Sequence, residues 1–141
     1  MSAVTSASLC WTSLSLCFLF VSADEKIITA ESGQNVTLTC RAPNNNIILV
    51  EWSRADLGDE YVLLYRDERF YPEQQHPSFK NRVDLQDRQM KDGDVSLMMK
   101  NVTINDTGTY ECRVLTNRWK RAVLDVDPIS VIYLRVVPPG E

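Results

Sequence analysis

Short runs in which apolar and polar residues alternate occupy most of the chain. The clearest of these runs are residues 36–40, 48–52, 61–65, 83–85, 95–99, 109–114 and 129–136. Polar stretches rich in Pro, Asn and Asp separate several of them, at 43–46, 56–60 and 67–78. A repeat of two residues is typical of strands with one buried face, and such polar stretches are typical of the turns between strands. The pattern therefore predicts an all-β sandwich of antiparallel sheets with almost no helix.

Residues 1–23 stand apart from this pattern because they contain no charged side chain. Their apolar run, 14–21, is far shorter than the ~20 residues that cross a bilayer. The small residues Ser22 and Ala23 follow it, and then the charged residue Asp24. This arrangement is typical of a secretory signal peptide, and the alternative is a buried strand or helix of the domain. We predict a signal peptide at 1–23, a folded domain at 24–137 and the start of a linker or tail at 138–141.

Cleavage after Ala23 would remove Cys10 and Cys17 and leave Cys40 and Cys112. An even pair of cysteines in an exported chain predicts one disulfide bond. The 15 basic and 19 acidic residues give a net charge of −4, which excludes a protein that coats nucleic acid. No later segment has the ~20 consecutive apolar residues of a membrane span, so we expect a secreted protein or the ectodomain of a longer one.

Alternation also assigns side chains to the two faces of a strand. Tyr110, Cys112 and Val114 share one face, while Glu111 and Arg113 share the other. Because Cys112 has to point inward to reach its partner, Glu111 and Arg113 are predicted to face water. The same reasoning places four residues of the earlier strands in the core, namely Leu38, Cys40, Val50 and Trp52.

Two aromatic residues occur at characteristic distances from the cysteines. Trp52 follows Cys40 by twelve residues, and Tyr110 stands two residues before Cys112 in a segment that reads Asp106-Thr107-Gly108-Thr109-Tyr110-Glu111-Cys112. This combination resembles the immunoglobulin fold, in which a disulfide joins two sheets, a Trp packs on it, and a tyrosine corner precedes the second Cys. The resemblance implies core roles for Trp52 and Tyr110 and a tight corner permitted by Gly108.

The chain is similar to the variable (V-set) type of this fold, because an extra run at 61–66 lies between the cysteines. In that type an Arg at the start of strand D pairs with the Asp before the corner, which implies a pair between Arg82 and Asp106. The stretch 66–112 is most similar to the butyrophilin and myelin-oligodendrocyte-glycoprotein group, which includes costimulatory ligands of T cells. The coxsackievirus-and-adenovirus-receptor group is the second match. The segment 127–130, Asp-Pro-Ile-Ser, replaces the Gly-x-Gly bulge of antigen-receptor variable domains and argues against such a chain.

The resemblance implies an extracellular recognition domain that binds another cell-surface protein, with immune co-signalling as the leading function. V-set relatives commonly bind through the face built by strands G, F, C and C′. The residues expected on that face are Glu51, Ser53, Glu111 and Arg113, with Tyr61 and Tyr65 as further candidates. The alternatives are an adhesion module that forms homodimers through the same face, and a secreted decoy.

The connection between strands F and G is a second candidate for partner contact. Trp119 is flanked there by Arg118, Lys120 and Arg121. An aromatic residue among cations has the composition of an interface anchor. The alternative is a Trp side chain folded onto its own sheet, with solvated charges around it.

Three Asn-x-Thr sequons, at Asn35, Asn101 and Asn105, predict N-linked glycans in an exported chain. No cofactor or metal site is expected, because His76 is the only histidine and lies in a polar loop. Neither a Ser-His-Asp set nor a Gly-rich phosphate loop is recognisable. We therefore predict that the chain is not an enzyme and binds neither nucleic acid nor a small-molecule substrate. Any attachment to a membrane would need a segment beyond this sequence.

Overall fold

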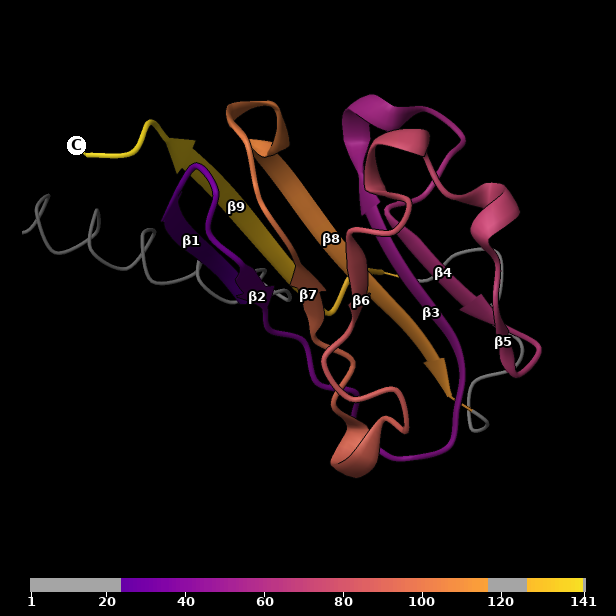
Figure 1. Ribbon diagram of the computed structural model, residues 1–141. Helices are drawn as coiled ribbons and strands as arrows, with labels where there is room; N and C mark the ends of the chain where they lie inside the picture. Colours follow the sequence, from indigo (N-terminus) through magenta and orange to yellow (C-terminus); the bar gives the residue numbers. More distant parts are fainter. Residues whose placement is uncertain (1–23, 117–126, 141) are drawn as a thin grey trace, which may run out of the picture.

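The computed structural model describes residues 24–116 and 127–140, and these residues form two β-sheets packed face to face (Figure 1). The strands are β1 (Asp24–Glu31), β2 (Val36–Leu38), β3 (Ile47–Arg54), β4 (Leu63–Arg66), β5 (Arg69–Phe70), β6 (Val83–Leu85), β7 (Leu97–Met99), β8 (Gly108–Thr116) and β9 (Ser130–Val137). One sheet has six strands in the order β1-β9-β8-β3-β4-β5, and the other has three in the order β2-β7-β6. The predicted all-β sandwich is confirmed, and its strand pairs are antiparallel as predicted except for β1 and β9, which pair in parallel at the edge of the six-stranded sheet.

The helical elements of the described residues are single 3-10 turns in the connections. They are η2 (Ala55–Leu57), η3 (Pro72–Gln74), η4 (Pro77–Phe79), η5 (Lys91–Gly93) and η6 (Ile104–Asp106). Pro opens η3 and η4, where its fixed φ suits the first position of a helical turn. The prediction of almost no helix is therefore confirmed for this part of the chain.

Two strands were not predicted from the sequence, and both lie at the edges of the six-stranded sheet. β1 begins with three charged residues, and Ile27 on its outer side is 76% exposed. β5 has only two residues, within a stretch predicted to be a loop. Edge strands have a partner on one side only, so they are short or carry charge, and their hydrophobic pattern is weak.

The core lies between the two sheets and is filled by the inward positions of the predicted strands. Leu38, Val50, Trp52 and Tyr110 are fully buried, as alternation predicted. The indole Nε1 of Trp52 donates a hydrogen bond of 2.9 Å to the main-chain oxygen of Val95, so this side chain links β3 to the segment before β7.

The predicted disulfide between Cys40 and Cys112 is formed, with a distance of 6.6 Å between the two Cα atoms. Cys112 lies on β8 at the centre of the six-stranded sheet, and Cys40 follows β2 of the other sheet. The bond therefore joins the two sheets directly, as the resemblance implied.

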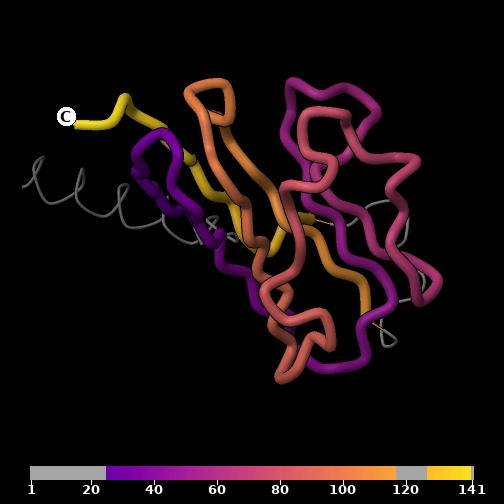
Figure 2. Tube along the Cα trace, in the orientation of Figure 1, coloured from indigo at the N-terminus to yellow at the C-terminus, as the bar shows by residue number. Residues whose placement is uncertain are grey.

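The turn between β1 and β2, the turn η6 and the end of β9 lie together at one end of the sandwich (Figure 2). The amide of Ser32 donates to the oxygen of Val137 at 2.8 Å, and the amide of Gly33 donates to the oxygen of Val102 at 2.7 Å. β8 starts at this end with Gly108 and runs to Thr116 at the opposite end (Figure 1). The chain therefore leaves the domain at the end that carries η6.

Candidate functional site

Four of the residues predicted for partner contact are brought together on the outer face of the six-stranded sheet. β3 and β8 pair with Glu51 opposite Arg113 and with Ser53 opposite Glu111. Because Trp52 and Cys112 between them point into the core, these four side chains point away from it. Together they form one continuous polar row across the two central strands.

The charges of this row are held in place by one another. Glu111 Oε1 lies 2.7 Å from Arg113 Nη1, and the two side chains are only 33% and 26% exposed. The same Nη1 atom donates to Ser53 Oγ at 3.4 Å. A surface ion pair of this kind adds only about 0–1 kcal/mol to stability, so its arrangement matters more for the pattern of charge that the face presents.

Glu51 is a partly buried carboxylate of the row. Burial raises the pKa of its carboxyl group, and the nearby charges of Arg113 and Arg66 lower that pKa and so oppose the rise. The face therefore holds a carboxylate whose charged form is disfavoured by partial removal from water.

Glu51→Gln is expected to raise the thermal midpoint at pH 7 and to leave it unchanged near pH 3. The folded-state pKa lies above the unfolded value of 4.5, so protonation favours the folded state. That contribution is full below pH 4.5 and is lost as the pH rises through the folded pKa, whereas Gln has no charge to bury. Thermal unfolding of both proteins from pH 3 to pH 8 measures the difference, and Glu25→Gln on the exposed edge is the matched control. An equal midpoint difference at every pH would contradict this reasoning.

Beside the polar row, the same outer face carries an apolar cluster that sequence reasoning missed. Leu49, Leu64 and Leu115 are 6%, 2% and 2% exposed and form a group separate from the main core. Their positions were visible as consecutive apolar residues at 47–50, 63–64 and 114–115, where alternation fails. A strand that is apolar on both sides is buried on both sides, and this was the available signal.

Tyr61 and Tyr65, the two further candidates, lie on opposite sides of the sheet. Tyr61 packs against the outer leucine cluster, and burial together with the charge of Glu51 raises the pKa of its phenol. Tyr65 packs against the main core, with its ring edge-to-face to Phe70 at a centroid distance of 5.2 Å. The prediction for Tyr65 was therefore wrong, because Leu64 takes the outward position on β4 and alternation turns Tyr65 inward.

A tyrosine and two arginines continue the outer face beyond the leucines. Tyr71 packs against the leucine cluster. The guanidinium carbons of Arg66 and Arg69 lie 4.8 Å and 3.8 Å from the centre of its ring. These distances are those of cation–π contacts. We call Arg66, Arg69 and Tyr71 the tyrosine–arginine cluster, which was not predicted from the sequence.

The other predicted contact residues cannot be placed in the same way. Trp119, Arg118, Lys120 and Arg121 fall outside the described residues. Their role in partner contact stays a prediction, and the face described above is assembled without them.

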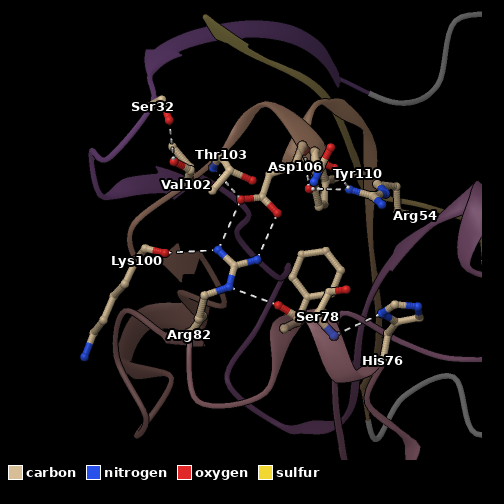
Figure 3. A network of polar contacts seen from close by, with 12 residues as sticks. Ser32, Arg54, His76, Ser78, Arg82, Lys100, Val102, Thr103, Asp106 and Tyr110 are labelled. Atoms are coloured by element: carbon tan, nitrogen blue, oxygen red, sulfur yellow. Dashed lines mark hydrogen bonds and ion pairs between the residues drawn. The ribbon is translucent and has the colours of Figure 1, made fainter. Parts of the chain in front are cut away.

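Arg82 and Asp106 meet at the end of the domain where the chain leaves it (Figure 3). The guanidinium holds both carboxylate oxygens, at 2.9 Å and 3.1 Å, and Asp106 is 3% exposed. Arg82 also donates to the main-chain oxygens of Ser78 and Lys100, and Asp106 accepts from the amide of Thr103. These contacts connect η4, η6 and the residue before β6, so the role of the pair is structural.

Arg54 is a further member of this end of the domain that the sequence did not indicate. Its guanidinium carbon lies 5.4 Å from the ring centre of Phe79 and 5.6 Å from that of Tyr110, and it donates to the Tyr110 hydroxyl at 3.1 Å. A Cβ atom on Gly108 would lie 2.8 Å from Cδ of Arg54. A side chain at Gly108 would therefore displace Arg54, and the backbone there does not adopt the left-handed conformation that favours Gly.

The side chain of His76, the single histidine, has a structural role in its own loop. His76 Nδ1 accepts a hydrogen bond of 3.1 Å from the amide of Ser78 and so caps η4. Among the described residues no group of three or more His, Cys, Asp and Glu side chains is placed to hold a metal ion. In the same part of the chain, no helix has the length and apolarity to cross a membrane.

The comparison with protein families identifies the chain. The model of the immunoglobulin V-set domain matches residues 23–123. The chain belongs to the immunoglobulin V-set family. Proteins of this family are receptors, ligands and adhesion proteins and are not enzymes, which confirms the prediction that this V-set chain is no enzyme.

Two curated proteins and one solved structure show which V-set domains this chain resembles. Over 62% of its length it is 30% identical to mouse V-set domain containing T-cell activation inhibitor 1. Over 84% of its length it is 26% identical to human junctional adhesion molecule B. The chain spans only 32% and 36% of these two relatives. Bovine butyrophilin has the same fold, with a TM-score of 0.63 and 22% identity over 81% of this chain and 52% of that one.

Proposed function

We propose that this V-set domain acts outside the cell and binds another cell-surface protein through the outer face of the six-stranded sheet. The observation that carries the proposal is the joining of a fixed charged row, a leucine cluster and a tyrosine–arginine cluster on one face. Interfaces are rich in Tyr and Arg and combine an apolar centre with polar surroundings. Immune co-signalling is the leading role, since one relative is named as an inhibitor of T-cell activation.

The buried leucines hold the partly exposed aromatic side chains of this face in position for binding. Leu49, Leu64 and Leu115 support Tyr61 and Tyr71 from within the molecule. Side chains that are already packed lose less conformational freedom when a partner arrives, so more of the contact energy appears as affinity. The polar row lies beside the leucines and supplies a charge pattern that selects among partners.

Arg66→Glu is expected to weaken binding of the partner about ten-fold or more while the domain stays folded. The side chain is 46% exposed and stacks on Tyr71, and arginines of this kind are frequent among residues that cost more than about 1 kcal/mol. The measurement is the binding of the tetramerised domain to T cells and to an array of cell-surface proteins. Thermal unfolding of the same variant reports whether it is folded.

The matched control is Lys91→Glu, the same charge reversal at an exposed residue of η5, between β6 and β7 of the other sheet. It is expected to bind as the unaltered domain does. Equal losses for both variants, or full binding by Arg66→Glu, would remove the assignment of the binding site to the outer face.

Homophilic adhesion is the second candidate, because another relative is named as a junctional adhesion molecule. Ile27 and Tyr133 favour it, since they pair across β1 and β9 and leave an apolar patch on the outer face, 76% and 39% exposed. Sedimentation equilibrium separates the two functions. A domain that dimerises at concentrations below about 100 µM supports adhesion, and a domain that stays monomeric up to that concentration counts against it.

A further inference from the structure

We propose that Asn35, Asn101 and Asn105 all carry N-linked oligosaccharides, and that the three glycans surround the end of the domain from which the chain leaves. All three side chains are exposed, and each stands in an Asn-x-Thr sequon. This inference depends on the proposed function in one respect only, namely that the domain is exported from the cell. The structure adds that the three sequons lie at the same end of the domain.

Asn35 and Asn101 are direct neighbours although they are far apart in the sequence. Asn35 precedes β2 and Asn101 follows β7, at the end where Val36 pairs with Met99. Asn35 Oδ1 accepts a hydrogen bond of 3.0 Å from the amide of Asn101. This contact uses the carbonyl oxygen of Asn35, and its Nδ2 atom, to which a glycan is attached, has no hydrogen bond within the described residues.

Asn105 lies in η6 and completes the group at the same end. Its main-chain oxygen accepts a hydrogen bond of 3.2 Å from Arg54, so its turn is held while its side chain is exposed. Thr107 Oγ1 accepts a hydrogen bond of 3.0 Å from the amide of Val136, which places the turn beside the end of β9. Ile104, 55% exposed next to Asn105, is an apolar side chain that a glycan at this end would cover.

The outer face of the six-stranded sheet stays free in this arrangement. None of the three asparagines lies on a strand of that sheet, because Asn35 and Asn101 adjoin the three-stranded sheet and Asn105 lies in η6. Bulky, hydrated glycans at the end where β9 stops exclude protein contact there. A partner is then left with the outer faces of the two sheets and the opposite end of the sandwich, and the polar row lies on the first of these faces.

The test expresses the full 141-residue chain in mammalian cells, once with its own residues 1–23 and once with an established secretory leader in their place. Gel mobility and intact mass are measured before and after peptide N-glycosidase treatment, on both cell extracts and medium. Extracts are included so that a variant retained in the cell is still scored. The second leader separates a failure of glycosylation from a failure of export.

Asn→Asp variants remove the sequons with the least disturbance. Asn35→Asp retains a side-chain oxygen that can accept the hydrogen bond from the amide of Asn101. Asp at 101 tolerates the left-handed backbone there, with a φ of 53°, whereas Gln is less suited to it. Thr37→Ser, which changes the sequence but preserves a sequon, is the matched control.

Three glycans are expected on the unaltered chain, one fewer on each Asp variant, and none on the triple variant. Thr37→Ser is expected to keep all three. Any asparagine whose Asp variant has the mass of the unaltered chain is thereby shown to lack a glycan, and the proposal fails at that site. A chain with the established leader and no enzyme-sensitive mass overturns it entirely. Because an unglycosylated domain can still bind its partner, that result would leave the proposed recognition function standing.

Discussion

Replacing both Cys40 and Cys112 with Ala is expected to lower the free energy of unfolding by roughly 4 kcal/mol. The disulfide closes a loop with a sequence separation of 72 residues, and its loss gives the unfolded chain many more conformations. Both cysteines are changed together so that no free thiol remains. Urea unfolding of the variant and of the unaltered domain, followed by Trp fluorescence, measures the difference.

The bond also has a packing role that the same comparison exposes. Cys40 and Cys112 belong to the buried core cluster that contains Trp52. The unaltered domain unfolded in the presence of a reductant is the control, because it loses the bond but keeps the sulfur atoms. A loss of less than about 1 kcal/mol in the Ala variant would show that the chain-entropy model fails for this domain.

Asp106→Ala is expected to lower the free energy of unfolding by about 3–5 kcal/mol, the usual cost of removing one partner of a buried ion pair. Asp106 is 3% exposed and holds the guanidinium of Arg82 with both oxygens. It also accepts from the amide of Thr103, which closes the capping box of η6. The variant would leave this amide without its acceptor, and the charge of Arg82 would keep only the main-chain oxygens of Ser78 and Lys100 as acceptors.

A double-mutant cycle separates the pair from its surroundings. Arg82→Met together with Asp106→Ala should cost less than the sum of the two single changes, since neither charge is then left alone. Glu73→Ala removes an ion pair with Arg69 whose two side chains are both about half exposed, and it should leave the unfolding midpoint unchanged. Additive costs in the cycle would mean that Arg82 and Asp106 stabilise the domain independently.

The sequence predicted the fold through residues whose position is set by period and by spacing. Tyr110, Cys112 and Val114 alternate with outward residues on β8, and the structure buries all three. Trp52 lies on β3 directly opposite Cys112, as the resemblance to the immunoglobulin fold implied. In these strands one face meets the core and the other meets water, so a repeat of two residues carries the whole signal.

The candidate site could be predicted only in part, because its remaining members depend on contacts between distant segments. Glu51 and Arg113 followed from alternation, but the leucine cluster beside them breaks it at Leu49, Leu64 and Leu115. The tyrosine–arginine cluster depends on the β4–β5 turn, where Asp67 and Glu68 both take a positive φ of 54° and 63°. Asp is among the residues that accept a positive φ, and the sequence predicted a loop over 67–78, but a Glu in this conformation is uncommon and nothing in the sequence indicated a two-residue turn between paired strands.

The parallel pairing of β1 and β9 determines how the domain would carry mechanical load. The eight residue pairs run from Asp24 opposite Ser130 to Glu31 opposite Val137. Tension between Asp24 and Val137 acts at opposite ends of this ladder, so its hydrogen bonds are sheared together and are not opened one by one. β9 is also paired with β8 on its other side, so a pull at the end of the chain is shared between two neighbours. The domain is therefore expected to resist a pull between Asp24 and Val137 more strongly than a pull that opens the ladder from one end.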